Sequence, residues 1–107
     1  MDATIKKQIE SIITNHPVVL FMKGTADSPM CGFSMRAVQI LEKLGTPFHD
    51  VNILLDDNLR QGLKDFGDWP TFPQLYVNQE LIGGCDIMVE MAQTGELAQL
   101  LKPHTTH

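Results

Sequence analysis

Cysteine is scarce in this chain of 107 residues, which contains only Cys31 and Cys85. Two cysteines are too few for the disulfide framework of a small secreted domain, so we expect the reducing cytoplasm as the compartment. Basic clusters are also missing: eight Lys and Arg are dispersed among thirteen Asp and Glu, and the net charge is −5. Because phosphate binding needs clustered cations, this balance argues against a nucleic-acid-binding surface.

Long apolar runs and targeting segments are lacking too. No apolar stretch approaches the roughly 20 residues of a membrane span, and residues 1–15 resemble neither a signal peptide nor a transit peptide. Repeats and linkers are absent, so the composition predicts one domain over residues 1–107, with a loose tail at 103–107. No metal-ligand spacing along a helix or hairpin is formed by the four histidines, which are His16, His49, His104 and His107.

The hydrophobic pattern predicts alternating helices and strands. The first half should contain a helix that ends at 15–17, a buried strand over 18–22, a helix over 32–44 and a strand over 48–53. The second half should contain a helix capped by Asp56 or Asp57 and a hairpin of strands at 74–77 and 80–82. A last helix, capped by Asp86 and broken near Gly95, should follow. The first two strands should be parallel, because a helix joins them, and the hairpin should add an antiparallel edge. This order predicts an α/β, thioredoxin-like fold with a mixed four-stranded sheet flanked by helices.

Cys31 stands just before the predicted helix at 32–44. The free N–H groups and partial positive charge of a helix N-terminus favour an anion, so this thiol should ionise readily, and Lys23 can add a second positive influence. A dithiol oxidoreductase would carry its resolving cysteine three residues later, where this chain has Ser34. The alternative is that Cys31 is a small buried hydrophobic residue.

The segment 69–73 contains Pro73 directly before a predicted strand. A cis Phe72–Pro73 bond would turn the backbone groups of Phe72 toward a cleft, where an extended peptide can pair with them. An ordinary trans proline in a loop is the alternative.

The run Gly83-Gly84-Cys85-Asp86 precedes the last predicted helix. Its glycines allow a ligand close to the backbone, the helix N-terminus can bind a carboxylate, and Asp86 can accept from an amine. A tight turn with an Asp cap explains the same residues. Cys85 is either a packed small residue or a disulfide partner of Cys31, if the two Cα atoms lie within about 7 Å.

Together these segments suit a ligand with two carboxylates, one ammonium group and a thiol. Lys23 and Arg60 can hold one carboxylate, the helix end at Asp86 the amino-acid head group, and Phe72 the peptide in between. Glutathione fits this description.

The motifs also carry a family resemblance. They are Phe21-Met22-Lys23-Gly24-Thr25, Pro29-Met30-Cys31-Gly32-Phe33-Ser34, Trp69-Pro70-Thr71-Phe72-Pro73-Gln74-Leu75 and Gly83-Gly84-Cys85-Asp86. In this order they resemble a monothiol glutaredoxin of the Cys-Gly-Phe-Ser class, in its short single-domain bacterial form. The resemblance implies a cis Pro73, glutathione contacts from Lys23, Arg60, Phe72, Cys85 and Asp86, and a 2Fe–2S cluster bridged between two subunits. Cys31 of each subunit and two glutathione thiols would be the cluster ligands.

Two functions follow from this resemblance. The first is carriage of the cluster for iron–sulfur assembly and transfer, by a protein that is a monomer without the cluster and a homodimer with it. Its expected partners are cluster donors and acceptors and BolA-like proteins. The alternative is a glutathione-dependent thiol–disulfide oxidoreductase, which removes glutathione from proteins with Cys31 as the nucleophile.

Overall fold

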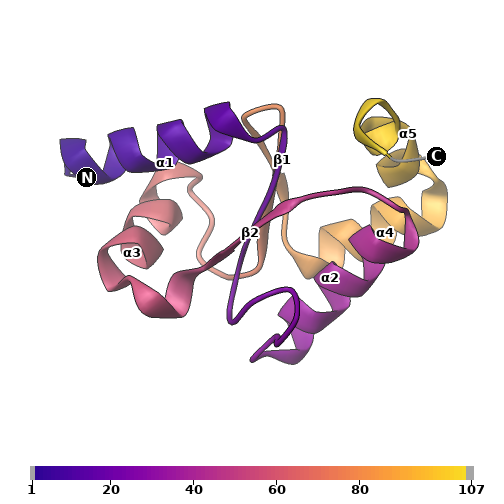
Figure 1. Ribbon diagram of the computed structural model, residues 1–107, viewed down its shortest axis with the longest axis horizontal. Helices are drawn as coiled ribbons and strands as arrows, with labels where there is room; N and C mark the ends of the chain where they lie inside the picture. The colour runs from indigo at the N-terminus through magenta and orange to yellow at the C-terminus, as the bar shows by residue number, and fades with distance from the viewer. Residues whose placement is uncertain (1, 106–107) are drawn as a thin grey trace.

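A four-stranded mixed sheet organises the chain in the computed structural model, which describes residues 2–105 (Figure 1). The strands are β1 (Val18–Met22), β2 (His49–Asn52), β3 (Gln74–Val77) and β4 (Glu80–Gly83). They lie in the order β2-β1-β3-β4, in which β1 and β2 are parallel and the other two pairs are antiparallel. The expected mixed sheet is therefore confirmed.

Helices cover both faces of this sheet. They are α1 (Ala3–Asn15), α2 (Gly32–Lys43), α3 (Asp57–Phe66), α4 (Cys85–Thr94) and α5 (Glu96–Leu101), with short 3₁₀ turns η1 (Ile53–Leu55) and η2 (Lys102–His104). Figure 1 shows α1 and α3 on one side of the strands and α2, α4 and α5 on the other. Within residues 2–105 no helix is both long enough and apolar enough to cross a membrane.

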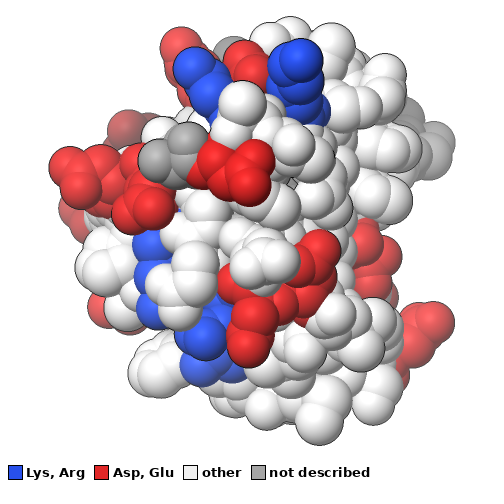
Figure 2. All heavy atoms as spheres, turned by 90° about the vertical axis from the view of Figure 1, so that its left-hand side faces the viewer, with Lys and Arg blue, Asp and Glu red and all other residues white. Residues whose placement is uncertain are grey.

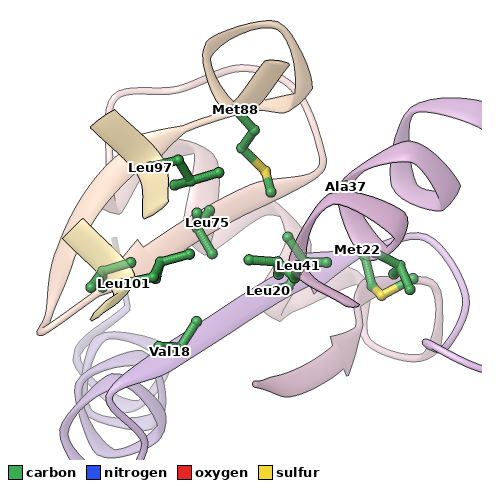
Figure 3. Packing of buried hydrophobic residues seen from close by; sticks show 11 residues of the cluster. Val18, Leu20, Met22, Ala37, Leu41, Leu75, Met88, Leu97 and Leu101 are labelled. Atoms are coloured by element: carbon green, nitrogen blue, oxygen red, sulfur yellow. The ribbon is translucent and has the colours of Figure 1, made fainter. Parts of the chain in front are cut away.

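The strand β1 is buried on both faces, as its continuous apolar sequence indicates. Val18, Leu20 and Met22 pack toward α2, α4 and α5, where Leu41 and Met88 complete the cluster (Figure 3). The alternate residues of β1 face the opposite cluster, beneath α1 and α3. Each such fully buried side chain contributes roughly 1.5–3 kcal/mol relative to exposure, so β1 is the element on which both layers depend.

Helix starts and breaks follow local chemistry. The carboxylate of Asp56, rather than that of Asp57, caps α3 by accepting from the N–H of Leu59 at 3.1 Å. Gly95, with φ +85°, separates α4 from α5, so the expected break is confirmed. The expected cap of α4 is wrong: Gly84 is the N-cap and Asp86 lies in the first turn, because the helix begins at Cys85, two residues earlier than a cap at Asp86 would place it.

The C-terminal segment differs from the loose tail expected at 103–107. Lys102–His104 form η2, and the hydroxyl of Thr105 donates to the carbonyl of Leu101 at 2.8 Å. The same hydroxyl lies 2.9 Å from that of Thr46. These contacts fasten the chain through residue 105, and residues 106–107 lie outside the described residues.

The loop between β1 and α2 is held by side chains of β2. The N–H of Gly24 donates to Asn52 Oδ1 at 3.0 Å, and the N–H of Ala26 donates to Asp50 Oδ2 at 2.7 Å. The neighbouring strand therefore sets the path of the chain into α2. Gly24 itself has φ +90°, in the region that favours glycine.

Replacing Gly24 should damage this loop more than replacing a nearby glycine. A Cβ at Gly24 would lie 2.5 Å from the carbonyl oxygen of Ser28 and 2.7 Å from the nitrogen of Met30, whereas one at Gly32 would meet nothing within 4 Å. We expect Gly24→Ala to lower the free energy of unfolding by more than about 1 kcal/mol, and Gly32→Ala to leave it unchanged or slightly raised. Urea unfolding of both variants measures this, and equal losses would contradict it.

Candidate functional site

Cys31 is the N-cap residue of α2 and is half-buried. Its sulfur makes no capping hydrogen bond within the usual geometric limits, yet the N–H groups of the first turn are close enough to stabilise a thiolate. The backbone N–H of Ser34 has the largest effect and lowers the pKa of the Cys31 thiol, and burial, the next largest, opposes it. The N–H of Phe33, the charge of Lys23 and the Ser34 hydroxyl then lower this pKa further. Cys31 is therefore an activated thiol.

Ser34 has a structural role that the sequence pattern did not reveal. Its side chain is fully buried, and its Oγ accepts a hydrogen bond from the N–H of Lys23 at 3.1 Å. This bond ties the end of the β1 segment to the first turn of α2. The residue at the position of a resolving cysteine thus fastens the loop that presents Cys31 and Lys23.

Cys85 has the opposite character. It is the first residue of α4 and only 7% exposed, and burial together with the charge of Asp86 raises the pKa of its thiol. The charge of Arg36 opposes this rise. Both cysteines are free in the structure, but Cys31 alone combines exposure with activation.

A cavity of about 410 Å³ opens beside Cys31 and gathers every predicted site residue. Among its lining residues are all six candidates, namely Lys23, Cys31, Arg60, Phe72, Cys85 and Asp86. They come from the end of β1, from α2, α3 and α4, and from the segment before β3. The structure therefore brings together residues up to 63 positions apart, between Lys23 and Asp86.

The lining residues outside the six candidates include a cation, Lys64, and an indole, Trp69. Lys64 follows Arg60 by four residues on α3, a spacing that places both side chains on one helix face, and it lines the same cavity. This four-residue spacing was the feature of the sequence from which Lys64 could have been predicted. Trp69 also lines the cavity, and its indole nitrogen is buried without a hydrogen-bond partner among the described atoms.

Three cations therefore line this cavity in a chain whose net charge is −5. Figure 2, which faces the α1 and α3 end of the molecule, shows a band of Lys and Arg between acidic groups. Arg60 Nε donates to Asp57 Oδ1 at 3.3 Å, and the guanidinium has further donors for a ligand. The local field favours an anion beside Cys31.

The Phe72–Pro73 peptide bond is cis, as expected. The side-chain amide of Gln74 is fully buried and donates to the carbonyls of Trp69 and Thr71, at 3.0 and 3.3 Å. One amide thus holds the turn that shapes this wall of the cavity.

The fold and the site define the class: a thioredoxin-like protein with one activated thiol at a helix N-terminus, facing a cis proline. The glutaredoxin family model matches residues 18–82, and the chain belongs to the glutaredoxin family. A probable monothiol glutaredoxin 2 from Rickettsia conorii is 60% identical over 99 residues, which cover 92% of each chain. The chloroplastic monothiol glutaredoxin-S14 of Arabidopsis thaliana is 57% identical over 95 residues, covering 89% of this chain and 55% of the relative.

Solved structures agree with this family. The solution structure of reduced poplar apo GrxS14 matches with a TM-score of 0.83 and 53% identity, covering 94% of this chain and 92% of that one. Together with the relatives, it supports the expected resemblance to monothiol glutaredoxins, bacterial ones among them.

The two thiols should titrate on opposite sides of an ordinary cysteine. Because helix N–H groups and Lys23 stabilise its thiolate, Cys31 should be half-ionised at a pH below the ordinary value of 9.0, and Cys85 above it. Thiolate absorbance near 240 nm, followed against pH in Cys85→Ser and Cys31→Ser variants, isolates each group. Lys23→Gln should move the Cys31 midpoint upward, and coinciding midpoints for the two thiols would contradict the prediction.

Proposed function

We propose that this protein binds glutathione and carries a 2Fe–2S cluster between two copies of itself, for iron–sulfur cluster assembly and transfer. The observation that carries the proposal is the single activated thiol: a site with Cys31 but no resolving cysteine suits a ligand better than a dithiol exchange. For that reason, cluster carriage is the leading proposed function and catalysis is the second.

The donor set fits such a cluster only if ligands come from outside the chain. A 2Fe–2S cluster normally needs four thiolates. One chain offers the accessible Cys31, while Cys85 is buried at the start of α4 and its thiol is held neutral. Two chains with one thiolate each leave two positions, which glutathione thiols can fill. When bound, the cluster would supply the exchangeable iron and sulfide, and Cys31 would be its protein ligand.

The cavity walls support the placement of glutathione. Lys23 and Arg60 would hold one carboxylate, with Lys64 close by on α3. The N-terminus of α4 and Asp86 would hold the amino-acid head group, and the backbone of Phe72 would pair with the peptide. Cys85 would contact this ligand without bonding to metal.

A second subunit has apolar surface to contact around the thiol. Met30 and Phe33, which flank Cys31, are 69% and 61% exposed. This surface is small and the net charge opposes self-association. The two subunits would therefore be held together mainly by the cluster and its two glutathiones. The chain would be a monomer when empty. BolA-like proteins and cluster donors and acceptors would be its partners, in the cytoplasm.

A second candidate function is glutathione-dependent reduction of protein–glutathione disulfides, which the lowered pKa of Cys31 favours. The Cys31 thiolate would attack the glutathione sulfur, form a Cys31–glutathione disulfide and release the protein thiolate. A second glutathione thiolate would then attack this disulfide, release oxidised glutathione and regenerate Cys31. Ser34 is no obstacle to this route.

Charge reversal at Lys23 should abolish retention of the cluster. After anaerobic reconstitution with iron, sulfide and glutathione, we expect a coloured dimer from wild type, a colourless monomer from Lys23→Glu and from Cys31→Ser, and an intermediate yield from Arg60→Glu. The Arg60 guanidinium already shares one N–H with Asp57, so its loss should cost less.

Lys43→Glu is the matched control, because Lys43 is an exposed lysine at the far end of α2 and does not line the cavity. Size-exclusion chromatography with visible absorbance separates the outcomes, and thermal unfolding confirms that exposed charge changes leave the fold intact. A cluster-bearing Lys23→Glu dimer, or a stable dimer of the empty wild type, would show that the glutathione site is misplaced.

Turnover of a glutathionylated substrate distinguishes the two candidate functions. If carriage is the main role, the cluster-free protein should show negligible deglutathionylation with excess glutathione. The measurement is release of oxidised glutathione, coupled to glutathione reductase, with Cys31→Ser as the blank. Robust turnover that depends on Cys31 would instead favour the oxidoreductase.

A further inference from the structure

Two histidines stack at the end of the sheet opposite Cys31. His16 follows α1 directly before β1, and His49 is the first residue of β2. Their ring centroids are 3.8 Å apart, with an angle of 11° between the planes. Cys31 follows the loop at the other end of β1, so this pair lies outside the site described above.

A third histidine faces the same place. A surface cavity of about 410 Å³ is lined by His16, Pro17, Val18, Pro47, Phe48, His49 and His104. His104 belongs to the C-terminal turn η2, and its Nε2 is buried without a hydrogen-bond partner among the described atoms. The turn is fastened beside it by the hydroxyls of Thr46 and Thr105. Three separate segments therefore line one cavity, and two of them are joined there by stacked imidazole rings.

We propose that His16, His49 and His104 form a histidine clasp, which joins the end of α1, the start of β2 and the C-terminal turn at neutral pH and loosens when the stacked rings ionise. Neutral imidazoles stack as apolar aromatic rings. Two protonated rings at the same separation carry like charges in van der Waals contact, so ionisation opposes the stack. The clasp therefore responds to the binding of protons by its imidazole rings.

Among the charged groups near the pair, Asp50 favours a charged His49, but its effect is smaller than those of burial and of His16. Asp50 adjoins His49, but its Oδ2 accepts the N–H of Ala26 on the active-site loop. Lys102 lies on η2, and Glu80 on the β3–β4 hairpin, whose residue Asn78 donates to the carbonyl of Pro17. Burial, and then the charge of His16, lowers the pKa of His49 below its ordinary 6.5, against an opposing effect of Asp50.

The sign of the pH effect follows from that lowered pKa. The unfolded chain binds a proton at His49 at a higher pH than the folded chain does. Stability from the clasp is therefore fully present above pH 6.5 and is lost as the pH falls from 6.5 through the folded-state pKa of His49. Transition metals are a separate question: within residues 2–105, no three His, Cys, Asp or Glu side chains are grouped to hold a metal ion.

NMR titration of the histidine ring protons tests the clasp directly. In the wild type, the His49 signal should shift at a lower pH than that of a free histidine. His16→Phe keeps a ring for stacking and removes its charge, so the His49 midpoint should move upward. An ordinary His49 midpoint, or one that His16→Phe leaves unchanged, would overturn the proposal.

Urea unfolding at pH 7.5 and 5.5 supplies the second readout. Wild type should lose more stability between these values than His49→Phe, while Asn15→Ala, an exposed neighbour without a titrating group, should behave as wild type. His104→Phe tests the third member: ring-proton shifts of His49 should change in this variant. Equal losses in wild type and His49→Phe, or a pH effect that EDTA removes, would overturn the clasp as a proton-sensitive joint.

Discussion

The site depends on the interaction between the free N–H groups at the start of α2 and the sulfur of Cys31. They favour negative charge on Cys31, and their position is set by the surrounding structure. The buried Ser34 hydroxyl ties α2 to the N–H of Lys23, and the side chains of Asn52 and Asp50 hold the loop from the side of β2. Since β1 is buried on both faces, the loop leaves from a rigid strand, and the thiol is presented at a fixed place beside the cavity.

The contrast between the two cysteines then determines what the chain can do. Both line one cavity and both lie at a helix N-terminus. Cys31 is half-buried beside Lys23, whereas Cys85 is buried beside Asp86. The pKa of the Cys31 thiol is therefore lowered and that of the Cys85 thiol is raised. A chain with one usable thiolate and three nearby cations is suited to an anionic thiol ligand from outside. This is the physical reason for joining glutathione and the cluster in one proposal.

Much of this arrangement was predictable from the sequence. The continuous apolar run of β1, the order of elements and the position of Cys31 before a helix led to the fold and to a cavity lined by the predicted residues. The N-cap residue of α4 was not predictable from the sequence, because Gly84 and Asp86 are both acceptable N-cap residues and tertiary packing decides between them. The fastening of η2 through Thr46 and Thr105, and the stacking of His16 on His49, join residues distant in the sequence. No local pattern records such contacts.

The central claim is that each chain gives one thiolate to a shared cluster and that glutathione completes it. Native mass spectrometry of the reconstituted protein tests it most directly, because it weighs the intact assembly. The account predicts one species that contains two chains, one 2Fe–2S unit and two glutathiones, and that persists in Cys85→Ser. A cluster held by a single chain, a dimer without glutathione, or loss of the species in Cys85→Ser would contradict it.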